Sequence, residues 1–283
     1  MKKIALAVTL ASILSTNAQA DALGIYLGGQ LWDNQASGTL GDSSSQIDFN
    51  LVDEKQNSFF VAFEHPLPFI PNLRIATTSL ETDGVTTLAA DFEFDDETFR
   101  KNTQVNADFN VSYVDYTLYY ELFDNDLLSF DFGLTARDFD GDVTLAAQIT
   151  TDSGTTTQSD SIAVTDIVPM LYVATNVGLP LTGLNLYAQG NFLSFDDHTL
   201  YDYEVGVSYE LIDNLVVDMN INLGYRAVKL ELEDLNDLYT NIEFDGVFIG
   251  KTFHADKTRK TASAIATLLH FTAICIKNTV VEI

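Results

Sequence analysis

Cysteine and basic residues are scarce in this chain. Of its 283 residues one is a cysteine, Cys275, so no disulfide can form within it. Exported soluble domains often depend on disulfides, and this chain must be constrained by other means. Lysine and arginine number 14 against 41 aspartates and glutamates, which sets the formal net charge at −27. Because proteins that bind nucleic acid bring basic groups to the phosphates, we expect no nucleic-acid partner.

Helical periodicity is also missing before residue 255. The acidic composition does not indicate disorder, because 46% of the residues are hydrophobic and 11% are aromatic. Many of the acidic residues gather in four clusters, which are Asp42–Glu54, Asp91–Glu97, Asp138–Asp142 and Glu231–Asp237. Between the clusters lie segments in which apolar and polar residues alternate. This layout predicts strands joined by solvated acidic loops.

The first twenty residues have the three parts of an export signal. Lys2 and Lys3 form a basic start, Ile4–Leu14 is almost wholly apolar, and residues 18–20 (Ala-Gln-Ala) supply a cleavage site. The apolar stretch is shorter than the roughly 20 residues of a membrane-spanning helix. We therefore expect residues 1–20 to be a cleaved signal peptide.

Period-two alternation predicts ten strands. In the clearest of them, Leu128–Arg137, leucine, phenylalanine and alanine form one face, and serine, aspartate, threonine and arginine are on the other. Each segment has about the ten residues that a tilted strand needs to cross a bilayer. The ten segments are Leu23–Trp32, Asn57–Glu64, Leu73–Leu80, Ser112–Leu122, Leu128–Arg137, Asp166–Val177, Leu184–Phe195, Tyr201–Leu211, Leu215–Arg226 and Ile242–Phe253.

Two of these segments are irregular. Over Val105–Leu122 the apolar phase slips near Tyr113 and Val114. The slip predicts either a bulge or a strand that rises above the membrane. Pro169 lacks a backbone N–H, and it weakens the pattern at the upper end of its strand.

The connections between these segments alternate in length. Short links lie at Pro66–Asn72, Phe123–Leu127, Gly178–Gly183 and Ile212–Asn214. The links between them are long, at Asp33–Gln56, Glu81–Val111, Asp138–Thr165 and Val228–Asn241, with Asp196–Leu200 as a brief exception. Short periplasmic turns and long external loops are typical of outer-membrane β-barrels. An even number of strands leaves both chain ends on the periplasmic side.

Alternation alone also fits a secreted β-sandwich. The polar faces favour the barrel, because they combine arginine with carboxylates and contain no lysine, as a narrow interior requires. We expect an interior salt-bridge network of Glu64, Asp115, Glu121, Asp131, Asp202, Glu204 and Asp218 with Arg74, Arg137 and Arg226. The predicted fold class is all-β: an antiparallel transmembrane β-barrel of about ten strands over residues 21–254, with short periplasmic turns and long acidic external loops.

Five stretches form a familiar set. They are residues 64–72 (Glu-His-Pro-Leu-Pro-Phe-Ile-Pro-Asn), 117–121, 133–137 with 139–141, 200–203 and 244–248. Together they resemble a family of gammaproteobacterial outer-membrane β-barrel proteins that has little assigned function. The resemblance covers most of residues 1 to about 253. It implies a barrel in the outer membrane of a Gram-negative cell and offers no catalytic residues.

The end of the chain departs from that resemblance. Such barrels usually stop at a terminal aromatic residue, whereas here Ala255 follows Phe253 and His254, and the composition changes. Residues 262–276 are apolar but too few to span a membrane comfortably. We interpret 255–283 as an atypical tail from a shifted or extended reading frame. A periplasmic extension or plug is the alternative.

Two short patterns could carry chemistry. The run Asp196-Asp197-His198 pairs a carboxylate with a possible general base, and Asp95 with Asp96 would complete the set of an omptin-type surface protease. The segment Asp138–Asp142 resembles a fragment of a calcium loop without its bidentate glutamate. Both spacings are commonplace. We interpret them as an acidic loop with an incidental histidine and as a solvated turn, and assign no catalytic, cofactor-binding or metal-binding residue.

These features predict a non-enzymatic, porin-like barrel with a structural, adhesive or narrow-channel role. The alternative is an omptin-like surface protease or another membrane-embedded hydrolase. Expected partners are outer-membrane lipid and lipopolysaccharide, the barrel-assembly machinery and, at the acidic loops, weakly bound divalent cations. We expect a monomer without a cofactor.

Overall fold

The computed structural model describes residues 23–41, 45–95, 97–125, 127–151, 154–195, 198–212, 217–235 and 238–255. The predicted signal peptide 1–20 lies outside the described residues, and so does the predicted tail after Ala255. Within the described ranges, no helix is long and apolar enough to cross a membrane.

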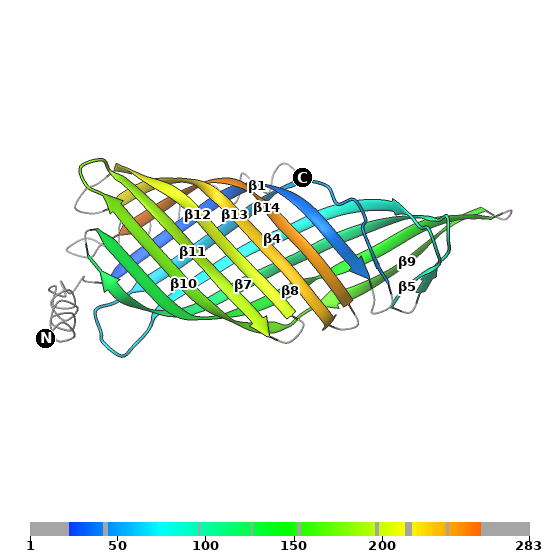
Figure 1. Ribbon diagram of the computed structural model, residues 1–283, viewed down its shortest axis with the longest axis horizontal. Helices are drawn as coiled ribbons and strands as arrows, with labels where there is room; N and C mark the ends of the chain where they lie inside the picture. The colour runs from blue at the N-terminus through cyan, green and yellow to red at the C-terminus, as the bar shows by residue number, and fades with distance from the viewer. Residues whose placement is uncertain are drawn as a thin grey trace, which may run out of the picture.

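Ten antiparallel strands, counted over the described ranges, close into one barrel (Figure 1). In chain order they are β1 (Gly24–Gly41), β3 (Glu54–Glu64), β4 (Asn72–Thr87), β7 (Gln104–Asp124), β8 (Leu128–Thr151), β9 with β10 (Gly154–Val164 and Ile167–Leu179), β11 (Leu184–Phe195), β12 (His198–Ile212), β13 (Asp218–Leu235) and β14 (Leu238–Ala255). β9 and β10 act as one interrupted strand, because both pair with β8. β14 pairs with β1 along almost its whole length, from Ile25↔Ala255 to Gly41↔Tyr239, and this ladder closes the barrel.

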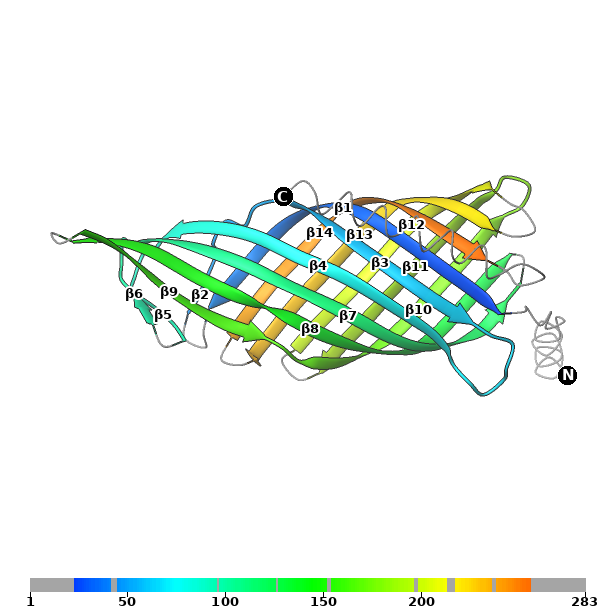
Figure 2. The ribbon, with the colours of Figure 1, turned by 180° about the vertical axis from the view of Figure 1, so that it is seen from behind.

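All ten predicted strands are present, and most are longer than predicted. β7 begins at Gln104, β8 continues to Thr151, and β13 continues to Leu235. Much of the acidic sequence that was predicted to form loops is therefore strand. Short turns at one end of the barrel do alternate with long hairpins at the other, and β8 and β9 reach furthest (Figure 2).

The phase slip on β7 is an exchange of polarity between its two faces. From Val105 to Tyr113 every second side chain is apolar and buried inside the barrel. The same inward positions become polar at Asp115 and Thr117, while Tyr116 and Leu118 turn apolar side chains outward. The ladders with β4 and β8 continue through this level without a register shift, so no bulge is present there. The outer face of the strand is therefore apolar in one half and polar in the other, as the predicted rise above the membrane requires.

The same exchange occurs on the neighbouring strands. On β8 the inward residues change from Thr135 and Arg137 to Phe139 and Val143, and the outward ones from Leu134 to Asp140. We call the part beyond this level the extension. It comprises strand segments within residues 32–41, 78–87, 104–114, 138–164, 227–235 and 238–248, together with the described connections 45–56 and 88–103. The rest is the membrane barrel, whose outer belt is apolar.

The extension contains an apolar core of its own. Its buried members include Trp32, Leu40, Phe49, Leu80, Phe109, Val111, Phe139, Val143, Leu145, Leu230, Ile242, Phe244 and Phe248. A small hairpin of β5 (Phe92–Phe94) and β6 (Glu97–Phe99) joins this core through three fully buried phenylalanines. Gln158 Nε2 of β9 donates to Glu97 Oε2 at 2.8 Å and fixes the hairpin to the wall. The extension is thus packed like a soluble β-protein.

Candidate functional site

Two arginines and two aspartates cross the barrel interior where the membrane barrel meets the extension. We call Asp115, Arg137, Asp202 and Arg226 the charged layer. Arg137 donates from Nε and Nη2 to the two oxygens of Asp115, each at 2.7 Å, and Nη2 also reaches Asp202 Oδ2 at 2.8 Å. Arg226 donates to both oxygens of Asp202 at 2.9 and 2.8 Å. The predicted salt bridges between these four residues are confirmed.

The register of the strands places these charges. Asp115 and Arg137 are direct partners in the β7–β8 ladder, whereas Asp202 comes from β12 and Arg226 from β13. All four point inward because their parity on each strand matches the polar face. Arg137 is fully buried, so its charge is separated from water and depends on its two carboxylate partners.

Neutral side chains complete the charged layer. The Tyr113 hydroxyl donates to Asp202 Oδ2 at 2.7 Å, and the Arg137 guanidinium carbon lies 3.7 Å from the Tyr113 ring centroid. Asn191 Nδ2 donates to Asp115 Oδ2 at 3.2 Å. The sequence analysis missed both partners, although Asn191 lies on the polar face of a predicted strand. Tyr113 was missed because it lies where the apolar phase of the predicted strand slips.

The other predicted members of the network form separate contacts. Glu64 accepts a hydrogen bond from the Tyr119 hydroxyl at 2.7 Å, and Glu204 accepts from Gln189 Nε2 at 2.7 Å and from Gln30 Nε2 at 3.2 Å. Asp218 lies 3.4 Å from His254 Nδ1, and Arg74 stacks on Phe60 at 4.6 Å. Glu121 and Asp131 are opposite each other in the β7–β8 ladder. The interior is therefore polar throughout the membrane barrel, but its ion pairs concentrate in the charged layer.

The charged layer and the apolar core above it fill the barrel at this level. Two positive and two negative charges neutralise one another, and their oxygens are already used by internal donors. A group that is to act as a general acid or base needs access to a substrate, and this arrangement offers none. The charged layer therefore fills the interior at this level and links the strands that carry its residues.

Only some residues of the possible hydrolase pattern lie within the described ranges. Asp96, Asp196 and Asp197 lie outside the described residues, whereas His198 begins β12 opposite Phe195. Asp95 lies in the turn between β5 and β6. The interpretation of His198 as incidental and the catalytic alternative both stay predictions.

The interpretation of residues 138–142 as a solvated turn is wrong, and the segment does not have the shape of a calcium loop either. Residues 138–142 lie in the middle of β8, where Asp138, Asp140 and Asp142 all point outward. Alternate residues on a strand are about 7 Å apart along its axis, whereas calcium ligands must all lie about 2.3–2.6 Å from one ion. Among the described residues, no three His, Cys, Asp or Glu side chains are placed to hold a metal ion. Weak divalent-cation binding at the acidic surface stays a prediction.

The outer wall of the extension is acidic. Its outward-facing carboxylates include Asp33, Glu81, Asp83, Asp108, Asp140, Asp142, Glu243 and Asp245. The described part of the extension has four basic side chains, Lys55, Arg100, Lys101 and Lys229. Arg100 is paired with Asp91 at 2.9 Å and Lys229 with Glu231 at 2.9 Å. This wall therefore presents negative charge to the solvent.

The pKa of Asp108 reflects the repulsion between these carboxylates. Partial burial, together with the charges of Asp83 and Asp142, raises the pKa of Asp108. A raised pKa means that the ionised form is disfavoured in the folded state, so Asp108 costs stability above that pKa and nothing below its ordinary value. We expect Asp108→Asn to raise the melting midpoint slightly at neutral pH and to leave it unchanged in acid. Thermal unfolding of the wild type and of the variant, at neutral pH and in acid, measures the two melting midpoints.

Asp140→Asn is the matched control, because its partner on β7 is Ser112 and not an acid. Asp83 and Asp108 are direct ladder partners. An equal rise in the melting midpoint of both variants would show that the repulsion between these two residues does not destabilise the protein more than other surface charges do.

The comparisons with known proteins concern the fold. No protein-family model and no curated protein matches the sequence. Among solved structures, the outer membrane protease OmpT from Escherichia coli is 8% identical, with a TM-score of 0.50, over 87% of this chain and 100% of that one. An outer membrane channel from Pseudomonas putida F1 matches at 9% identity and a TM-score of 0.37, over 85% and 98%. The transport unit of the autotransporter AIDA-I from Escherichia coli matches at 12% and 0.36, over 90% and 97%. The chain has the fold of outer-membrane β-barrels.

Proposed function

We propose that the protein is a non-enzymatic barrel of the bacterial outer membrane and that the acidic outer wall of its extension performs its function, as an adhesive or structural surface. The observation that carries the proposal is the exchange of polarity along the strands. The extension has an apolar core and a charged exterior, so it is a folded domain that the membrane barrel holds outside the bilayer. Export by the predicted signal peptide supports this location.

The filled interior argues against transport along the barrel axis. Arg137, Tyr113, Phe139 and Phe248 are all buried at or just above the charged layer. Opening a path there would separate buried ion pairs from their partners, which is costly. We expect the purified protein to give no stepwise currents in a planar bilayer where a porin in the same lipid does. Regular stepwise currents from the folded protein would contradict the proposed role and would favour a narrow-channel role instead.

The negative charge of the outer wall of the extension determines which kind of partner this surface attracts. A surface of exposed carboxylates attracts cationic polymers and cationic faces of other proteins at long range, and salt screens this attraction. We expect cells that display the protein to adhere to polylysine-coated beads more strongly than cells without it. Replacing Asp83, Asp108, Asp140 and Asp142 together by Asn is expected to reduce that gain several-fold.

The matched control replaces Thr155, Thr156 and Thr157 by Asn, because these exposed residues of β9 carry no charge. Adhesion should be unchanged in this variant and should fall with added salt in the wild type. Equal adhesion of the wild type and the Asp→Asn variant, with equal surface amounts of both, would refute the charged wall as the binding surface.

The hydrolase alternative makes a separate prediction. If the pattern around His198 were catalytic, cells that display the protein would cleave a peptide library and His198→Ala would abolish the cleavage. We expect no cleavage above that of cells without the protein. Cleavage that disappears in His198→Ala would replace the adhesive proposal with the omptin-like one.

A further inference from the structure

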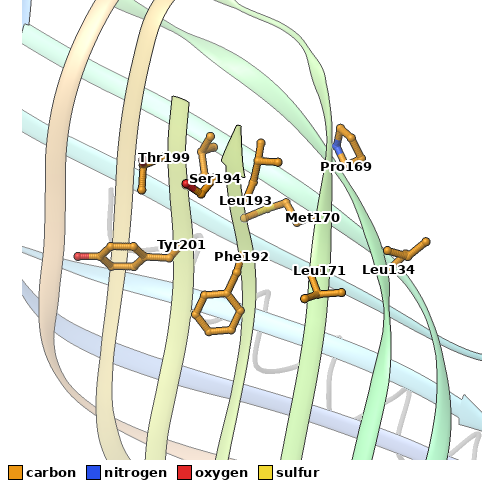
Figure 3. A pocket seen from close by; sticks show the side chains of 10 residues that line it. Leu134, Pro169, Met170, Leu171, Phe192, Leu193, Ser194, Thr199 and Tyr201 are labelled. Atoms are coloured by element: carbon orange, nitrogen blue, oxygen red, sulfur yellow. The ribbon is translucent and has the colours of Figure 1, made fainter. Parts of the chain in front are cut away.

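The extension has an open sheet edge along β9. Over its 11 residues β9 pairs with β8 and, among the described residues, with no other strand. The neighbouring wall begins only below it, because the last rung of the ladder between β10 and β11 is Leu171↔Phe192. Figure 3 shows Pro169 of β10 apart from Leu193 and Ser194 of β11 above this rung. One side of β9 therefore faces away from the sheet.

Three residues of β9 direct their backbone groups to this side. Ser161 N donates to Asp160 Oδ1 at 2.8 Å, so its amide points away from β8. In an antiparallel ladder, the N–H and C=O groups of every second residue point the same way. The amides and carbonyls of Thr155, Thr157 and Ser159 therefore also point away from β8. We call these three residues the open edge.

The opposite edge of the same group of strands, which are β4, β7, β8 and β9, is covered by the chain itself. Residues 45–56 lie against the upper part of β4. Val52 N donates to the Asp83 carbonyl at 2.8 Å, and Thr82 Oγ1 donates to the Val52 carbonyl at 2.8 Å. Of the two edges, one is thus closed by a described segment of this chain and the other is not.

β9 lacks most of the features that usually keep an edge strand from pairing. Such strands are short, or they carry lysine, proline or a bulge. β9 is 11 residues long and contains neither lysine nor proline, and its ladder with β8 has no register shift. Its one charged residue, Asp160, accepts the hydrogen bond from the amide of Ser161. The open edge is therefore suited to pairing with another extended backbone.

The charge beside the open edge indicates the chemistry of that backbone. Asp142 on β8 is oriented toward β9, because its Oδ2 accepts from Thr144 Oγ1 at 3.0 Å and from Ser161 Oγ at 3.5 Å. A strand added to β9 would lie about 4.8 Å from it. A lysine or arginine on the outer face of that strand would therefore reach toward Asp142. A second copy of this chain would instead bring another acidic wall to the edge, and repulsion disfavours it.

We propose that the open edge binds an extended, positively charged segment of a partner protein as an added strand. The backbone groups of Thr155, Thr157 and Ser159 form the ladder with this segment, and its basic side chains lie beside Asp142. Main-chain hydrogen bonds supply affinity, and alternate side chains supply specificity. The inference deepens the adhesive role proposed above and rests on it. It adds that the partner needs an extended backbone as well as positive charge.

A peptide pair tests the requirement for an extended backbone. The first peptide is short and alternates lysine with threonine, and the second has the same sequence with N-methyl groups on consecutive amides. The charges are equal, but the second peptide cannot form a ladder with either of its edges. We expect the first peptide to bind the full chain, folded in detergent, several-fold more tightly and to slow hydrogen exchange at the amides of Thr155, Thr157 and Ser159. Equal binding of the two peptides would overturn the proposal.

A proline substitution tests the position of the site. Thr157→Pro removes a donor from the open edge and leaves the ladder with β8 in place, because proline is tolerated where the missing N–H faces away from the sheet. The matched control, Thr157→Val, keeps the amide and the preference for a strand. We expect Thr157→Pro to bind the lysine–threonine peptide several-fold more weakly and Thr157→Val to bind it as the wild type does. Heat-modifiability and protease resistance show that both variants fold.

Two further outcomes separate this inference from its alternatives. Equal peptide binding by Thr157→Pro and Thr157→Val would overturn it, and so would exchange protection of the open edge that rises with protein concentration alone, because that result assigns the edge to a second copy. Adhesion to polylysine-coated beads reports on the charge of the wall, which both variants leave unchanged. Absent bead adhesion in the wild type refutes the adhesive role, whereas normal bead adhesion with equal peptide binding refutes the open edge alone.

Discussion

Replacing Asp202 by asparagine is expected to lower the free energy of unfolding by about 3–5 kcal/mol. Asp202 accepts hydrogen bonds from Arg137, from Arg226 and from the hydroxyl of Tyr113. The substitution keeps the shape of the side chain but leaves two buried guanidinium groups with one carboxylate, Asp115, between them. An uncompensated charge in the interior costs more than the lost bonds themselves. Urea unfolding in detergent, followed by the loss of heat-modifiability, measures the change.

Asp140→Asn provides the reference for this variant. Asp140 is exposed on the outer wall two residues after Asp138, and surface changes of this kind usually alter stability by less than about 0.5 kcal/mol. A variant that replaces Asp115 and Arg137 by leucine and methionine tests the reason for the loss, because removing both partners of a buried pair is often nearly neutral. If Asp202→Asn were as stable as Asp140→Asn, the charged layer would not hold the strands together.

The positions of the ten strands could be predicted from the sequence because the alternation survives in each membrane-spanning half. Their lengths could not be predicted from the outward apolar pattern alone. On β7 the residues Val105, Phe109 and Val111 alternate as regularly as Tyr116 and Leu118 do, but they belong to the opposite face. A search that follows one apolar face loses the strand at Tyr113, where the environment changes from lipid to water.

The charged layer was predictable in part for the same reason. Arg137 and Asp115 fall on the polar face of two adjacent strands, so parity alone brings them inward. Register would have placed Glu204 in this layer, because it is the direct ladder partner of Arg226. The Arg226 guanidinium bonds instead to Asp202, two residues further toward the extension on β12, and parity does not predict that choice. Pro169 had weakened the predicted strand at its upper end, and it lies two residues beyond the last rung of the ladder between β10 and β11, Leu171↔Phe192.

Truncating Phe109 to alanine is expected to weaken the extension by about 3–5 kcal/mol while the membrane barrel stays folded. Phe109 is 2% exposed, and its ring centroid lies 5.7 Å from that of Phe244 across the core. The extension packs around this core, whereas the membrane barrel is held by its ladders and by lipid. The variant should therefore be cut by protease within the β8–β9 hairpin much faster than the wild type, and the remaining barrel should still shift on heating.

Leu118→Ala on the same strand separates the two environments. Leu118 is 51% exposed to lipid, so its truncation leaves no cavity in a protein core and should not change the rate of cleavage. Because both substitutions remove an apolar side chain from one continuous strand, faster cleavage of Phe109→Ala alone would show that the apolar core, and not the strand as such, keeps the extension folded. Equal cleavage of both variants would mean that the extension and the membrane barrel unfold as one unit, and the extension could then not be treated as a separate binding domain.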